Sequence, residues 1–237
     1  MILTSHDRMG AVHSDAEPTG VWLEEFTTPF YAFLDAGLSA DVYSILGGPA
    51  PIDPRSVQAR GENPASVERY FDDPNTQTRL GFSWPLSTLD ISAYDGLFLA
   101  GGHGTVWDFT PNKTLAARIR TALDTDTFVA AVCHGPSGLL GVRDGHGRPV
   151  IAGRRVTGFS NREERAVGLD QVVPFRLETQ LKAQGAHYMA GPDFQSFAVR
   201  DGHLITGQNP ISSAETAQLL IEAVNSAAAI VPQRQAA

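Results

Sequence analysis

The segment that decides the fold reads Phe128-Val129-Ala130-Ala131-Val132-Cys133-His134-Gly135-Pro136. Its first five residues are apolar without alternation, which is typical of a strand buried on both faces of a parallel sheet. The strand stops at the only cysteine of the chain. A nucleophile followed two positions later by glycine fits a nucleophile elbow, the sharp strand-to-helix turn that exposes a reactive side chain. A lone cysteine can also be inert packing, but the adjacent histidine base favours a catalytic Cys133.

A second apolar run ends in a glycine-rich loop. Residues 97–100 are apolar and lead into Gly101-Gly102-His103-Gly104. Ligands of parallel α/β sheets bind outside the carboxyl ends of the strands, so we expect this loop to lie near Cys133. Its backbone amides, with that of His134, can form an oxyanion hole. A plain glycine turn is the alternative, and the spacing is not that of a dinucleotide fingerprint.

The rest of the chain alternates between short apolar runs and segments with helical spacing. We expect strands at residues 2–4, 40–46, 197–200 and 204–206, and helices within residues 20–37, 113–123, 161–167, 174–184 and 214–227. Asp201-Gly202 predicts a two-residue hairpin turn, and turn residues within 142–159 predict a small hairpin-like excursion. This alternation predicts an α/β fold with a mostly parallel sheet covered on both sides.

The segment 47–89 stands apart from this pattern. It is rich in Pro, Asp and Asn and shows only a weak helical stretch near residues 65–71. Connections of this length are unusual and often functional. We therefore interpret it as an insertion or lid within one domain that spans residues 1–237.

Composition narrows the classes of function. The net charge of −8 argues against binding to nucleic acid or an anionic membrane, which require clustered basic residues. No apolar stretch approaches the roughly 20 residues that span a bilayer, and no signal peptide is visible. One cysteine excludes an intrachain disulfide framework and fits a reducing cytoplasm. A lone thiol with scattered histidines also lacks the spacing of a structural zinc site, so we expect no metal.

These motifs together resemble a known family. The glycine loop and the cysteine segment are similar to the Parkinson-type deglycase and PfpI superfamily, which is related to class I glutamine amidotransferases. Three further segments resemble its glyoxalase III (D-lactate dehydratase) and chaperone branch: Thr19-Gly20-Val21-Trp22-Leu23-Glu24-Glu25 with Pro29-Phe30, Thr157-Gly158-Phe159-Ser160-Asn161 with Glu163-Glu164, and Thr206-Gly207-Gln208-Asn209-Pro210 with Ser212-Ser213. The resemblance covers nearly the whole chain and implies a flavodoxin-like three-layer α/β/α sandwich.

The resemblance also implies roles for individual residues. Cys133 matches the nucleophile and His134 the neighbouring base. Glu25 matches the acid that contacts the cysteine sulfur from the first helix. Glu164 matches the acid that orients the histidine, with Glu163 as the alternative. The amide of Gly102 matches the position that joins that of His134 in the oxyanion hole.

Several of these residues have plain structural interpretations as well. Glu25 could be a solvated carboxylate on a helix face, and Glu163 or Glu164 could supply favourable charge to the first turn of a helix. We place Gly101, His103 and Trp107 as candidate pocket residues. His103 could equally make structural hydrogen bonds in its loop, and Trp107 could be core. Asp108, just after the glycine loop, is a further candidate orienter.

The function implied by the resemblance is a cofactor-independent glyoxalase III. It would convert methylglyoxal or a related 2-oxoaldehyde into a 2-hydroxy acid through a hemithioacetal on Cys133. The implied partner is a small carbonyl substrate, and the family-level expectation is a homodimer. The segment 47–89 matches no assigned motif and leaves the substrate open.

Three alternatives remain open from the sequence. The same site could serve a cysteine-dependent amidase, peptidase or other hydrolase through an acyl-cysteine. The elbow could belong to an α/β-hydrolase whose histidine lies far downstream, such as His187 or His203. The chain could also be a stress-linked holdase or a redox sensor in which Cys133 is oxidised.

Overall fold

A mostly parallel sheet forms the centre of the molecule. The computed structural model describes residues 1–10 and 15–235. Within these residues, seven strands form one sheet in the order β3-β2-β1-β4-β5-β9-β8, and only β8 and β9 are antiparallel. The strands are β1 (Ile2–Leu3), β2 (Tyr43–Ser44), β3 (Trp84–Pro85), β4 (Gly96–Leu99), β5 (Phe128–Val132), β8 (Ala198–Asp201) and β9 (Leu204–Gly207). The predicted α/β class is confirmed.

Strand β5 lies between β4 and β9, and all five of its residues are buried. Ala130 and Val132 pack into one hydrophobic core, whereas Val129 and Ala131 pack into a second. Successive side chains of a strand point to opposite faces of its sheet. The unbroken apolar run is therefore what a strand covered on both sides requires.

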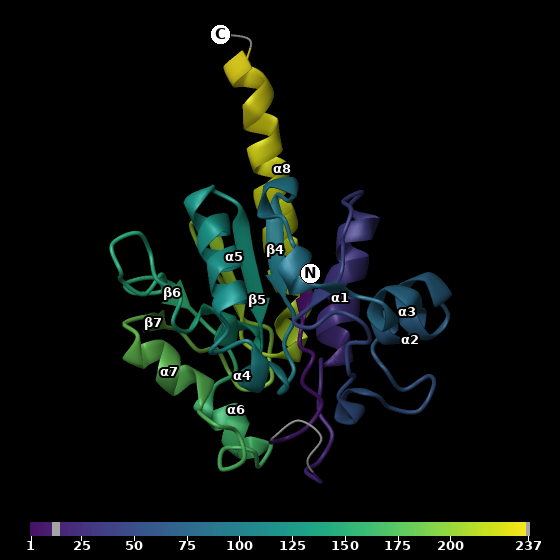
Figure 1. Ribbon diagram of the computed structural model, residues 1–237. Coiled ribbons are helices and arrows are strands. Elements are labelled where there is room, and N and C mark those ends of the chain that lie inside the picture. The colour runs from purple at the N-terminus through teal and green to yellow at the C-terminus, as the bar shows by residue number, and fades with distance from the viewer. Residues whose placement is uncertain (11–14, 236–237) are drawn as a thin grey trace.

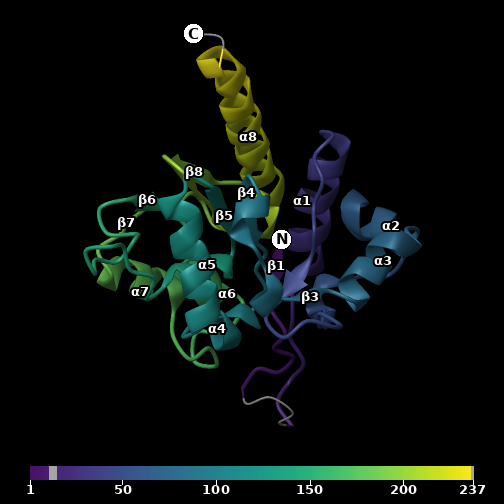
Figure 2. The ribbon, with the colours of Figure 1, turned by 45° about the horizontal axis from the view of Figure 1, so that its top comes forward.

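Helices cover the two faces of the sheet. On one face, α1 (Leu23–Asp35) packs against α8 (Ser213–Gln235), and both contribute to the core that contains Phe26, Phe30 and Leu220. On the other face, α5 (Lys113–Asp124) buries Leu115 and Ile119. The predicted three-layer arrangement is confirmed. Helix α8 runs past its predicted end, and its C-terminal part reaches beyond the rest of the molecule (Figures 1 and 2).

The segment 47–89 folds beside α1. It contains η1 (Pro54–Ser56), α2 (Ala65–Phe71), α3 (Pro74–Gly81), β3 and η2 (Leu86–Thr88). Figures 1 and 2 both place α2 and α3 next to α1, and α2 matches the predicted stretch. Helix α3 was not predicted, because its sequence is polar, yet the side chain of Asp73 caps it by accepting from the amides of Asn75 and Thr76. The role of this segment as a lid stays a prediction.

The region between β5 and β8 makes the predicted excursion. The Asp144 amide donates to Arg148 O over 2.8 Å in a tight turn, and β6 (Arg155–Val156) then pairs in parallel with β7 (His187–Tyr188). Helices α6 (Asn161–Ala166) and α7 (Leu177–Ala183) lie in the same region. Helix α7 begins three residues after Pro174, the first residue of the segment in which this helix is predicted.

Short helical turns complete the described chain. They are α4 (Thr105–Asp108), η3 (Ile91–Ala93), η4 (Gly135–Leu139) and η5 (Pro210–Ser212). The β8–β9 hairpin forms where predicted, but Asp201 pairs with Leu204, so the two-residue turn is Gly202-His203 rather than Asp201-Gly202, with φ of 61° at the glycine. Over residues 1–10 and 15–235, no helix is both long and apolar enough to cross a membrane.

Candidate active site

Cys133 occupies a strained turn at the carboxyl end of β5. Its φ is +59°, a conformation that a non-glycine residue adopts only when its surroundings impose it. The surroundings do so here, because the Cys133 amide donates to Gly207 O and its carbonyl accepts from the Phe159 amide, over 2.9 and 2.8 Å. The following helix, η4, is a 3₁₀ turn rather than an α-helix. This is the strand–turn–helix geometry of an elbow.

His134 lies between the thiol and a carboxylate. Its Nδ1 is 3.3 Å from Cys133 Sγ, and its Nε2 is 2.7 Å from Glu164 Oε2. The His134 side chain is fully buried, and that of Glu164 is 2% exposed. Burial opposes ionisation of Glu164, but the His134 charge and the hydrogen bonds of two imidazoles hold its pKa well below the ordinary value. An ionised Glu164 accepts only, so His134 Nε2 carries the proton that is donated to it. Nδ1 is the nitrogen that faces the thiol and can take up its proton.

Glu25 is the second carboxyl group beside the sulfur. It lies in the first turn of α1, is fully buried, and neither of its oxygens has a hydrogen-bond partner of ordinary geometry among the described residues. Burial raises the pKa of Glu25 well above its usual value. Burial also raises the pKa of the Cys133 thiol, and the Glu25 charge adds to this effect. Because each negative charge disfavours the other, the two groups compete for one proton.

Glu163 has a different environment from its neighbour. Its carboxylate closes a capping box with Ser160 at the start of α6 and accepts from the Phe194 amide and from the side chains of Gln208 and Asn209. These contacts anchor α6 to the loop after β9. Of the two acids left open by the sequence, Glu164 therefore contacts His134 and Glu163 does not.

The glycine loop lies against both the elbow and α1. A Cβ at Gly101 would collide with the Glu25 carboxyl and with Val132 O, and one at Gly102, where φ is +102°, would collide with Gly20 O. Within the described residues, the amides of Gly102 and His134 donate to no backbone carbonyl. The loop therefore needs glycine for close approach, and it leaves two amides free for a ligand.

Of the two pocket candidates with aromatic rings, His103 contacts the site and Trp107 packs elsewhere. The ring of His103 lies 4.1 Å from that of His134, and its Nε2 is 2.8 Å from Glu164 Oε1. Trp107 instead stacks on His6 at 5.3 Å. His103 thus belongs to the hydrogen-bonded site, whereas Trp107 packs against the N-terminal segment.

Sequence reasoning missed two residues that reach this site from the segment 47–89. Asp53 is fully buried and pairs with Arg55, whose Nη2 lies 3.4 Å from His103 Nδ1. Nothing in the local pattern distinguishes them from an ordinary capped 3₁₀ turn, which they also form. The sequence also predicted no individual role for Phe159, whose ring lies 4.6 Å from that of His134.

Three side chains of the site could in principle hold a metal ion. The ligand atoms of His103, His134 and Glu164 lie within 4.8 Å of one another. Two imidazoles and a carboxylate suit zinc. However, both Nε2 atoms already face Glu164 oxygens at hydrogen-bond distance, so the polar groups are satisfied without an ion. The donor set fits a proton-transfer site better than a metal centre.

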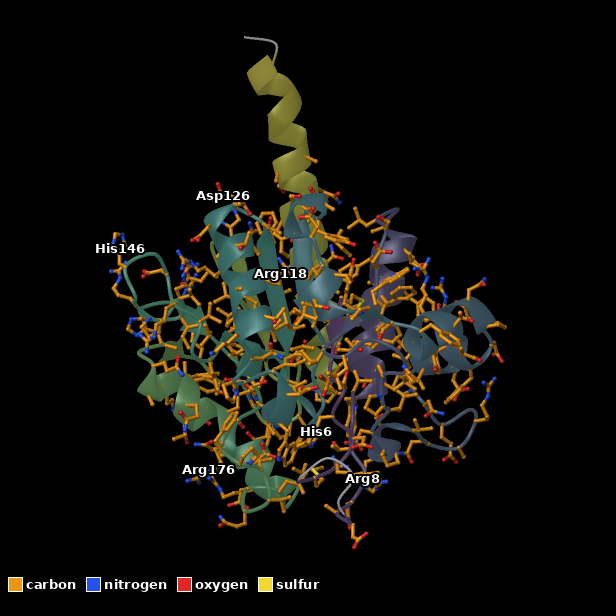
Figure 3. The ribbon with its side chains drawn as sticks, in the orientation of Figure 1. His6, Arg8, Arg118, Asp126, His146 and Arg176 are labelled. Atoms are coloured by element: carbon orange, nitrogen blue, oxygen red, sulfur yellow. The ribbon has the colours of Figure 1, made fainter. Side chains whose placement is uncertain are left out.

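The more distant candidates do not join the site. The ring of His203 lies 4.8 Å from that of Phe128, the first residue of β5, and its Nδ1 lies 3.8 Å from Asp126 Oδ1. Figure 3 shows Asp126 at the end of the molecule opposite His6. His187 is exposed in β7, the strand that pairs with β6. The α/β-hydrolase alternative is therefore wrong, because neither histidine lies at the carboxyl end of β5.

Asp108 is also not an orienter of His134. Its carboxyl group accepts from the Thr4 hydroxyl and the Ser5 amide, over 2.8 and 2.7 Å. Burial raises the pKa of Asp108 to about 7. Its contacts tie the N-terminal segment to α4, beside the glycine loop.

Comparisons with known proteins agree with one another. Residues 19–223 match the profile of the DJ-1/PfpI family. Glyoxalase 3 of Candida albicans is 32% identical over 232 residues, covering 94% of this chain and 96% of that protein. The glutathione-independent glyoxalase HSP31 of Saccharomyces cerevisiae is 31% identical over 234 residues, with the same coverage. The crystal structure of the 24 kDa rapid encystment protein of Francisella tularensis superposes with a TM-score of 0.88 at 39% identity, covering 94% of this chain and 97% of that one.

Proposed function

The chain belongs to the DJ-1/PfpI family, and we propose that it is a glutathione-independent glyoxalase that acts on small 2-oxoaldehydes such as methylglyoxal. One observation carries this function. The buried thiol of Cys133 lies against the base His134 on one side and the carboxyl group of Glu25 on the other. A nucleophile with two separate proton carriers is what the internal redox reaction of a 2-oxoaldehyde requires.

The first step is addition of the thiol to the aldehyde carbon. The thiol proton passes to His134 Nδ1, a sulfur–carbon bond forms, and the carbonyl π pair moves to oxygen. The amides of Gly102 and His134, which donate to no backbone carbonyl among the described residues, stabilise this oxyanion until protonated His134 returns the proton to it. The product is a hemithioacetal on Cys133, with no net change of oxidation state.

The second step moves a proton between the two adjacent carbons. Glu25 as carboxylate removes the proton from the former aldehyde carbon and returns it to the neighbouring carbon, while the hydroxyl proton of the first carbon moves to the oxygen of the second. An enediol lies between these two transfers, and the result is a thioester with a 2-hydroxyl group. Aldehyde carbon is oxidised and ketone carbon reduced, so no external oxidant or reductant takes part. The raised pKa of Glu25 makes its carboxylate a stronger base than that of an ordinary glutamate, which suits removal of a proton from carbon.

The last step is hydrolysis of the resulting thioester. Water attacks the acyl carbon while His134, held by Glu164, takes its proton, and the thiolate of Cys133 leaves and is reprotonated. Methylglyoxal and water thereby give lactate. Each group in the cycle returns to its starting protonation state.

The test is formation of lactate from methylglyoxal without any added thiol. Wild type should produce it, and Cys133→Ala and His134→Ala should not. His203→Ala is the matched histidine control and should keep wild-type kcat, because His203 lies beside Phe128 at the start of β5, whereas Cys133 follows the end of that strand. Lactate formation that persists in Cys133→Ala, or none in folded wild type, would refute the function.

The holdase alternative stays a prediction. Its test is suppression of client aggregation by wild type and by Cys133→Ala. Suppression that survives loss of the thiol would make it an activity separate from catalysis.

A further inference from the structure

Glu164 is shared between two imidazoles. Oε2 bonds to His134 Nε2 over 2.7 Å, and Oε1 bonds to His103 Nε2 over 2.8 Å. The His103 side chain is only 6% exposed. The reaction proposed above uses His134 and Glu164 but leaves His103 without a role.

The protonation of His103 follows from its partners. Glu164 is ionised and only accepts, so His103 Nε2 carries a proton. Burial and the neighbouring His134 lower the pKa of His103 to about 4, so the ring is neutral at pH 7. Its Nδ1 therefore holds a lone pair, and that atom faces Arg55 Nη2 at 3.4 Å. Because a guanidinium only donates, Arg55 favours the one tautomer that can donate to Glu164.

Arg55 is itself fixed by a buried carboxylate. Its Nε donates to Asp53 Oδ1 over 2.9 Å, and its Nη2 donates to Oδ2. Asp53 also accepts from the Thr19 hydroxyl and the Arg55 amide, both over 2.9 Å. A bidentate guanidinium pair is geometrically specific. The segment 47–89 thus presents a rigid donor to His103.

We propose that His103 is a positioning residue for the Glu164–His134 pair, and that the Asp53–Arg55 pair fixes its tautomer from the segment 47–89. This inference rests on the proposed function only for its kinetic readout. With one oxygen bonded to each ring, the Glu164 carboxylate cannot rotate away from His134. Without His103, Oε1 becomes a buried acceptor with no partner, and the orientation of the base toward Cys133 is lost.

The charged and titratable groups around His103 come from three elements. They are Glu164 from α6, His134 after β5, and Arg55 from η1. Phe159 covers a further side at 6.0 Å. A substitution of His103 therefore acts mainly through Glu164, and its effect can be read at the thiol.

The experiment uses Cys133 as its own reporter. Because the chain has one cysteine, alkylation by iodoacetamide followed by intact mass measures the reactivity of this thiol alone. His103→Leu should slow alkylation and lower kcat by about 10- to 100-fold, with KM changed less than threefold, as when an orienting hydrogen bond is removed. His103→Gln, whose amide can donate to Glu164 and accept from Arg55, should recover most of both rates.

Arg55→Met tests whether Arg55 fixes the tautomer of His103. It should lower both rates less than His103→Leu, and ¹⁵N spectra of the imidazoles should show protonation of His103 Nδ1 in part of the molecules. Wild-type alkylation and kcat in a folded His103→Leu protein, judged by thermal melting, would overturn the proposal. Losses in a folded His103→Gln protein as large as those in His103→Leu would overturn it as well. Slower alkylation in His103→Leu with no lactate from wild type would uphold this inference and refute the glyoxalase function.

Discussion

At the residue scale, the buried carboxyl group of Glu25 governs what the thiol can do. The adjacent Glu24 is only partly buried and lies on the same turn of α1. Glu25→Gln keeps the shape of the side chain but cannot carry a proton between carbon atoms. We expect it to lower kcat for lactate formation by at least about 100-fold, the lower range for loss of a general base. Glu24→Gln is the matched control and should keep wild-type kcat.

The same substitution should change how stability depends on pH. Burial raises the pKa of Glu25 above its ordinary value of 4.5, so ionisation is harder in the folded state than in the unfolded state. A group of this kind stabilises the fold fully below its unfolded pKa, and that contribution is lost as pH rises through the folded pKa. Urea unfolding from pH 5 to 9 should show Glu25→Gln gaining on wild type as pH rises. A constant difference between the two proteins would contradict a buried, high-pKa carboxyl group.

At the scale of elements, the elbow depends on how closely η4 approaches β4. A Cβ at Gly135 would collide with Leu99 O, a backbone atom that cannot move without shifting the strand. Gly135→Ala should lower the free energy of unfolding by roughly 1–3 kcal/mol and displace Cys133, so kcat should fall too. Gly81→Ala, at the end of α3 with nothing within 4 Å of the added Cβ, is the control and should lower neither. Unchanged stability of Gly135→Ala in chemical denaturation would mean that the turn is looser than this packing implies.

At the scale of the whole molecule, we predict that the homodimer forms through exposed apolar side chains at the edge of the sheet. Leu46, Phe82 and Trp84 are 77%, 76% and 62% exposed around the edge strand β3. Pro85 has no amide proton, so this short edge is poorly suited to strand pairing and a contact would rely on side chains. Native mass spectrometry should give twice the chain mass of 25.4 kDa.

The double variant Phe82→Ser with Trp84→Ser should shift the chain toward monomer. Val172→Ser, which removes an apolar side chain that is 44% exposed elsewhere, should not. A monomeric wild type at micromolar concentration would contradict the homodimer itself. A dimer that is insensitive to the double variant would place its interface elsewhere.

Much of the fold could be read from local patterns. The strand at residues 128–132 and the helix at residues 65–71 have the predicted bounds. The strand is buried throughout, which requires a continuous apolar run, and the helix is buried in part, which gives an amphipathic spacing. Helix α3 was missed, because its polar sequence is held by a cap and by packing rather than by propensity. The two-residue strand Trp84–Pro85 was missed because its pairing partner β2 is about forty residues away.

The sequence by itself predicted the groups that we propose carry the chemistry. A single cysteine after a buried strand, a histidine beside it and a glycine loop at the next strand end are local facts, and parallel topology brings strand ends together. Only the tertiary structure decided between Glu163 and Glu164, because neighbouring residues on one helical turn point in directions about 100° apart and only packing orients them. It alone joined Asp53 and Arg55 to His103, since hydrogen bonds between residues 48 positions apart leave no trace in local sequence.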